Sequence, residues 1–180
     1  HEKLLESESR FRSIFDSVSE AIFIHRLGDF AIIDMNRRAE ELLGYSSEEL
    51  RRGGIASFLL GAEGHGVRDA ELMMARVEQE GPQQIDGMIR HKSGHPFWVS
   101  ISLAKARLGE REVLLVSLRD IEGRKRTELA LQRKNAIHSV LSGVNKAILE
   151  VRDRQTLFDT VCNVALQISS FRLVWVAQLV

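Results

Sequence analysis

Short β-rich runs separated by turns fill most of the first 120 residues, and they limit the possible folds more than any other feature. The runs at 21–26 and 30–35 are separated only by Leu27-Gly28-Asp29. A short turn between two β-rich runs predicts an antiparallel hairpin. Three further runs are joined by glycine-containing turns and lie at about 84–91, 97–104 and 112–119. The pattern predicts a five-stranded antiparallel sheet.

Helical segments precede and interrupt these runs, which makes the predicted fold class α+β. An i, i+3, i+4, i+7 spacing predicts an amphipathic N-terminal helix over residues 1–18, with the apolar residues Phe11, Ile14, Phe15 and Val18. Short helices are expected after Asn36 and after Ser46 or Ser47, because these residues are good N-caps, and a longer one over about 67–79. The last strand is apolar on both faces, so we expect helices on one face. The N-terminal helix or a partner subunit is expected to cover the other.

The charge balance and the cysteine count exclude several classes of protein. The 25 basic and 25 acidic residues cancel, which gives no reason to expect a nucleic-acid partner. The single cysteine, Cys162, rules out an internal disulfide framework. No apolar run approaches the roughly 20 residues that span a bilayer. The chain begins at His1 without a methionine or signal peptide, so we expect a cytoplasmic excerpt of a longer protein.

The neutrality hides an asymmetry between two parts of the chain. Residues 1–120 hold 16 basic and 20 acidic side chains, whereas 121–156 hold eight basic and four acidic ones. An acidic body is thus followed by a basic segment. A solvated helix surface explains that charge, and we expect no membrane contact by this segment.

After Asp120 the apolar spacing changes to 4, 3, 4, 3, which is the seam of a coiled coil. The seam residues are Ile137, Leu141, Val144, Ile148 and Val151. They predict a linker helix over 121–151 that pairs with a second copy, although Thr127 and Lys134 weaken the seam upstream. We therefore expect a homodimer held through the N-terminal and linker helices. A further helix from Asp153 to about Ile168 and a strand from Phe171 complete the chain.

Three segments resemble a PAS domain in the right order. Residues 33–50 resemble the stretch from the second PAS strand into the first helices, 91–99 its hairpin, and 119–126 its Asp-Ile-Thr-Glu-Arg-Lys exit motif. The resemblance covers about residues 8–126. It implies a PAS core at 19–120, between an N-terminal cap helix at 1–18 and a signalling helix at 121–151.

The exit motif departs from the family at two positions. In the family, the aspartate and threonine tie the end of the sheet to the outgoing helix. Asp120 carries this role over, but Glu122 replaces the threonine and Gly123 the glutamate. Glycine costs a helix about 1 kcal/mol relative to alanine, which predicts a softer hinge. By resemblance, Asp120, Ile121, Glu122 and Gly123 form the coupling segment.

Residues 141–162 and 171–176 resemble the opening of a GAF domain, so we interpret 152–180 as a partial GAF domain. Both families imply regulatory signalling proteins, commonly histidine kinases or cyclic-dinucleotide enzymes such as diguanylate cyclases. No catalytic constellation occurs in the sequence. We therefore expect a non-enzymatic sensor, with the catalytic effector outside this chain.

PAS domains often hold a small molecule between the sheet and the helices. The resemblance suggests five residues for ligand contact: Asn36, His65, Met73, Met74 and Trp98. His65 lies just before the longer helix, where haem-binding members have a histidine, and methionines adapt to varied ligands or simply fill a core. Haem and flavin stay open without a specific motif, and the ligand is unknown.

Other histidines and the cysteine have ordinary interpretations. His91 and His95 flank a glycine turn, so they do not form a helical zinc pair. His25 shares a strand face with Ala21 and Phe23, which is typical of a satisfied structural histidine. Cys162 lies outside the PAS region, so flavin–cysteine photochemistry is not expected.

Two functions remain open at this stage. In the first, the PAS domain senses a small ligand, a redox cue or a partner and relays the change through a dimeric helix. In the second, it binds no ligand and acts only as a dimerisation module.

Overall fold

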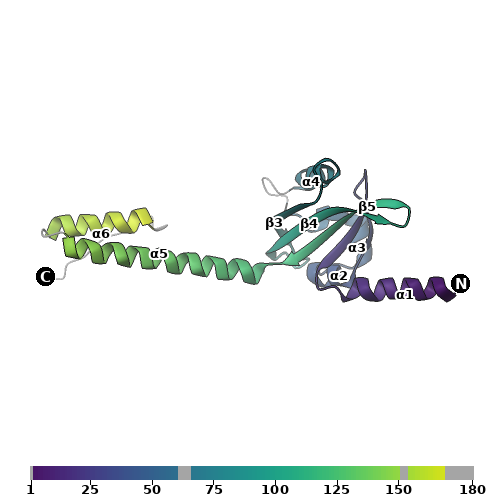
Figure 1. The fold of residues 1–180 in the computed structure, drawn as a ribbon, viewed down its shortest axis with the longest axis horizontal. Helices are drawn as coiled ribbons and strands as arrows, with labels where there is room; N and C mark the ends of the chain where they lie inside the picture. Colours follow the sequence, from purple (N-terminus) through teal and green to yellow (C-terminus); the bar gives the residue numbers. More distant parts are fainter. Residues whose placement is uncertain (1, 61–65, 151–153, 169–180) are drawn as a thin grey trace. The chain divides into compact units, whose positions relative to one another are not determined.

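A computed structural model describes residues 2–60, 66–150 and 154–168, and the chain divides into two units, 1–123 and 124–180. The first unit contains the sheet and the short helices (Figure 1). Its helices are α1 (Glu2–Ser17), α2 (Arg37–Leu43), α3 (Ser47–Gly53), the 3-10 helix η1 (Gly54–Ser57) and α4 (Val67–Glu80). Its strands are β1 (Ala21–Arg26), β2 (Ile32–Met35), β3 (Gln83–Arg90), β4 (Pro96–Leu108) and β5 (Arg111–Asp120).

The five strands form one antiparallel sheet in the order β2-β1-β5-β4-β3, which confirms the predicted sheet. The first hairpin differs from the prediction, because β2 begins at Ile32 instead of residue 30. Phe30 has a positive φ of 53°, and its amide donates to the Arg26 carbonyl at 3.1 Å. These features make Phe30 part of the turn and lengthen the loop between the strands.

The main core lies between one face of the sheet and the short helices. Phe23 of β1, Val116 of β5 and Leu103 of β4 are buried on this face and belong to one cluster with helical residues. The helical part of the cluster includes Leu43, Leu50, Met74 and Val77. Helix ends are fixed locally. Asn36 caps α2, as predicted, and Ser46, one of the two predicted candidates, caps α3 in a capping box with Glu49.

Among the α1 residues whose side chains are described, 6–17, one is buried against the opposite face of the sheet. Phe15 packs with Ile24 and Val113, whereas Phe11 and Ile14 are 40% and 61% exposed. The predicted stripe on α1 is thus half exposed. This face of the sheet is covered by α1 at Phe15 and retains partly buried residues such as Leu115 around it.

The second unit contains most of α5 (Glu122–Glu150) and also α6 (Arg154–Ile168). The predicted linker helix is present as α5. The strand predicted from Phe171 lies outside the described residues. No helix in the described part of the chain is both long and apolar enough to cross a membrane.

Candidate ligand-binding cavity

A cavity of about 90 Å³ lies between the core face of the sheet and the segments η1 and α4. Phe23, His25 and Val116 line it from the sheet, and Met73 and Met74 line it from α4. Asp69, also in the lining, is exposed, and its carboxylate accepts a 3.1 Å hydrogen bond from the Gly66 amide. His25 is therefore the buried ionisable group of an otherwise mainly apolar lining.

His25 is 1% exposed, and its Nδ1 lies 2.8 Å from the Phe30 carbonyl oxygen. A carbonyl oxygen can only accept, so Nδ1 carries the proton and donates this bond. Desolvation by burial lowers the pKa of His25, and the bond to Phe30 opposes this shift only in part. The imidazole is therefore neutral at pH 7, with its lone pair on Nε2.

Because His25 is buried as a neutral imidazole, we expect the folded chain to lose stability on mild acidification. Above the unfolded-state pKa of about 6.5, His25 is neutral in both states and contributes no pH dependence. Below it, the unfolded chain binds a proton that the folded chain resists, because the folded pKa is lower. The free energy of unfolding should then fall with decreasing pH, by at most about 1.4 kcal/mol per pH unit.

Urea unfolding between pH 7.5 and 5.5 measures this effect in wild type and in His25→Asn, where the dependence should flatten. His138→Asn is the matched control, because His138 is exposed on α5 and should leave the dependence unchanged. An unaltered pH dependence in His25→Asn would contradict the assignment.

The predicted ligand contacts separate into three groups. Met73 and Met74 lie together in the lining of the cavity. Asn36 and Trp98 do not belong to that lining, and His65 lies outside the described residues. His25 was not predicted to line a cavity, although its alternation with Phe23 places both side chains on one strand face.

Asn36 is fully buried, and its side chain joins α1, β1 and α2. Its Oδ1 accepts hydrogen bonds from the amides of Ile22 at 2.9 Å and Ala39 at 3.1 Å. Its Nδ2 donates to the carbonyls of Phe15 at 3.1 Å and Glu20 at 2.9 Å. All four bonds are internal to the fold, so the side chain holds the helices and strand together.

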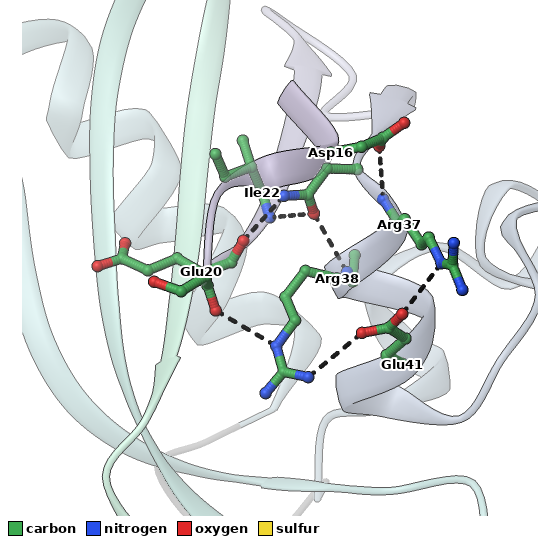
Figure 2. A network of polar contacts seen from close by, with 9 residues as sticks. Asp16, Glu20, Ile22, Arg37, Arg38 and Glu41 are labelled. Atoms are coloured by element: carbon green, nitrogen blue, oxygen red, sulfur yellow. Dashed lines mark hydrogen bonds and ion pairs between the residues drawn. The ribbon is translucent and has the colours of Figure 1, made fainter. Parts of the chain in front are cut away.

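Further bonds around this junction attach α2 to the end of α1 (Figure 2). The Arg37 amide donates to the Asp16 carboxylate at 2.9 Å, and Arg38 Nε donates to the Ser19 carbonyl at 3.3 Å. Glu41 accepts from both arginine side chains, at 3.0 Å and 3.4 Å. The connection from α1 to β1 is thereby fixed against the start of α2.

The coupling segment, residues 120–123, connects β5 to α5 and is hydrogen-bonded to Trp98 of β4. The Ile121 amide donates to the Trp98 carbonyl at 3.0 Å, which continues the ladder between β4 and β5 by one bond. The Glu122 carboxylate accepts from the Trp98 amide at 3.1 Å, and the Asp120 carboxylate accepts from the Glu122 amide at 2.8 Å. Glu122 thus takes the place of the backbone carbonyl that a longer β5 would offer to β4.

The remaining predicted residues that the structure describes lie on the coupling segment and on α5. Gly123 is exposed, and an added Cβ would meet nothing within 4 Å, so no steric need for glycine exists there. Ile137 and Leu141 of the predicted seam are 55% and 56% exposed. The side chains of Val144, Ile148 and Val151 lie outside the described residues.

A haem or flavin does not fit the cavity as it is shaped here. Cofactor pockets typically enclose about 300–1,000 Å³, and this cavity encloses about 90 Å³. In the described part of the chain, no group of three or more His, Cys, Asp or Glu residues could hold a metal ion. The cavity has room only for a much smaller molecule.

Comparisons with known proteins agree with this architecture. The PAS domain family matches residues 19–122. The methyl sulfide methyltransferase-associated sensor of Methanosarcina acetivorans is 29% identical over 132 residues, which cover 73% of this chain and 13% of that protein.

Two solved structures share the fold at low sequence identity. The PAS domain of an HTR-like protein from Haloarcula marismortui has 22% identity and a TM-score of 0.58, covering 67% of this chain and 96% of its own. The PAS domain of a two-component sensor histidine kinase has 22% identity and a TM-score of 0.52, covering 64% and 98%. With the family match spanning more than half of its residues, the chain belongs to the PAS domain family.

Proposed function

We propose that this chain is the sensory and signal-transmission segment of a signalling protein. In this proposal the cavity takes up a small molecule, the sheet changes its packing, and the exit of β5 passes the change to α5. Pairing of α5 with a second copy then biases a downstream effector, either a histidine kinase or a cyclic-di-GMP enzyme. A ligand acts here by favouring one of two pre-existing arrangements.

The observation that carries this proposal is the use of both backbone groups of Trp98 by the exit segment. The carbonyl accepts from Ile121 and the amide donates to Glu122, so the first turn of α5 is bonded to β4 as well as continuous with β5. A shift of β4 relative to β5 would stretch one of these bonds. Such a shift therefore has a direct physical route to the start of α5.

Replacing Asp120 or Glu122 with alanine should uncouple input from output while the fold stays intact. Each change removes one exposed or half-buried side-chain bond, worth about 1 kcal/mol, so unfolding should change little. Glu122→Gln should keep the response, because the amide oxygen can still accept from Trp98. The measurement is effector output of the full-length protein, together with hydrogen exchange at the first turn of α5.

Glu128→Ala is the matched control, since Glu128 is an exposed residue of α5 whose ion pair with Lys125 is loose at 3.6 Å. It should respond as wild type does. A normal response in both Asp120→Ala and Glu122→Ala would refute coupling through this exit.

A second function, dimerisation without a ligand, is favoured by the small cavity and by the exposed seam residues Ile137 and Leu141. Colourless purified protein with a native mass of twice the polypeptide mass, and no added mass from a ligand, would support it. A bound small molecule in that mass spectrum would support sensing instead.

We also propose that residues 152–180 open a GAF domain and that this segment works in the cytoplasm. Support for the first point is the helix α6, which begins at Arg154, next to the predicted N-cap Asp153. Extending the chain beyond Val180 and testing whether it folds as an independent domain would examine the assignment.

A further inference from the structure

The buried imidazole of His25 has one nitrogen committed to the fold and one that no bond in the described structure uses. Nδ1 donates to the Phe30 carbonyl, which fixes the neutral tautomer and leaves Nε2 as an acceptor. No fully enclosed side-chain nitrogen or oxygen in the described part of the chain lacks a hydrogen-bond partner, so Nε2, which has none there, is not fully enclosed. Because His25 lines the cavity, a molecule in the cavity could donate to Nε2.

From this we infer that His25 Nε2 accepts a hydrogen bond from a compact, uncharged ligand that carries one N–H or O–H donor on an otherwise apolar body. The inference rests on the proposed sensing function of the same cavity, and it names the ligand class. A charged ligand is disfavoured because the buried lining offers no opposite charge. Asp69 lies exposed, and its carboxylate already accepts from Gly66.

The size of the cavity restricts this class further. A dry cavity of about 150 Å³ accommodates benzene, whereas this one is about 90 Å³. A five-membered ring is therefore the largest rigid probe that it should admit without rearrangement. Pyrrole and furan form a suitable pair, because they have nearly the same shape and only pyrrole carries an N–H donor.

The test measures binding of pyrrole and of furan to the full chain by titration calorimetry. Wild type should bind pyrrole about tenfold more tightly than furan, which corresponds to about 1.4 kcal/mol for one hydrogen bond. In His25→Asn the side-chain amide can still donate to the Phe30 carbonyl but offers no acceptor at the Nε2 position. The ratio of the two dissociation constants should then fall to about one.

A second measurement requires no substitution at His25. The ¹⁵N resonance of Nε2 should shift when pyrrole is added to wild type and should stay in place with furan. Ala70→Leu should block both probes by filling the cavity, because Ala70 lines it. Ala75→Leu is the matched control, since Ala75 is exposed on the same helix and does not belong to the lining.

The outcomes separate this inference from the proposed function. Equal binding of pyrrole and furan by wild type, abolished by Ala70→Leu, would overturn the role of His25 and leave the cavity as a binding site. Binding of neither probe would overturn the inference and ligand sensing in this cavity together. A tenfold preference that is lost in His25→Asn supports the inference.

Discussion

Replacing Asn36 with alanine should destabilise the folded chain by about 3–5 kcal/mol, which for a domain of this size lowers the melting temperature by about 10–20 °C. The side chain is fully buried and makes four hydrogen bonds. Its loss leaves two amides and two carbonyls without these partners, and an N-cap alone is worth about 1 kcal/mol. Urea unfolding followed by circular dichroism measures the change.

Asn36→Asp separates the acceptor from the donors of this side chain. The carboxylate can still accept from Ile22 and Ala39, but it faces the carbonyls of Phe15 and Glu20 as a buried charge. At pH 7 the variant should be at least as unstable as Asn36→Ala. Its stability relative to wild type should recover at low pH, because the protonated acid can donate one hydrogen bond.

Asn135→Ala serves as the control for the loss of an asparagine side chain, because Asn135 is exposed within α5. It should unfold within about 0.5 kcal/mol of wild type. A loss of less than 1 kcal/mol in Asn36→Ala would contradict the role of Asn36 as the link between α1, β1 and α2.

Asn36 also illustrates how far the sequence predicts this structure. The cap on α2 is a contact between residues three apart, so local chemistry was sufficient to predict it. The bonds to Phe15 and Glu20 depend on where α1 ends against β1, which a pattern of residue types does not contain. For the same reason Asn36 was predicted to contact a ligand, whereas both polar atoms of its side chain bond to the backbone of the fold.

The strands and the coupling segment also combine features that local sequence predicts with contacts that it does not. β-rich runs and turn residues predicted all five strands, but β2 begins later than predicted because Phe30 has a positive φ and its amide bonds to the Arg26 carbonyl in the turn. Glu122 departs from the family pattern, and its bond to Trp98 spans 24 positions in the sequence. No local rule predicts such a contact, and the coupling role of this segment was implied only by its resemblance to the PAS exit motif.

If α5 pairs with a second copy as we propose, Leu141→Asp should convert that dimer into monomers. Leu141 is 56% exposed on α5 at a seam position, and burial of a leucine side chain contributes about 1.5–3 kcal/mol when complete. In a parallel pair, the substitution removes this contribution twice and places two carboxylates against each other. We expect a loss of about 3 kcal/mol or more, which raises the dissociation constant at least about a hundredfold.

Sedimentation equilibrium over a range of chain concentrations measures that constant, and Leu129→Asp provides a stringent control. Leu129 lies on the same helix and is 54% exposed, close to the 56% of Leu141. The two leucines differ in that Leu141 is a seam residue and Leu129 is not. If any exposed leucine of α5 drove association, both variants would dissociate alike. Dissociation of Leu141→Asp alone would assign the interface to the 4, 3, 4, 3 seam, whereas a wild-type dissociation constant in both would show that the copies do not pair through this part of α5.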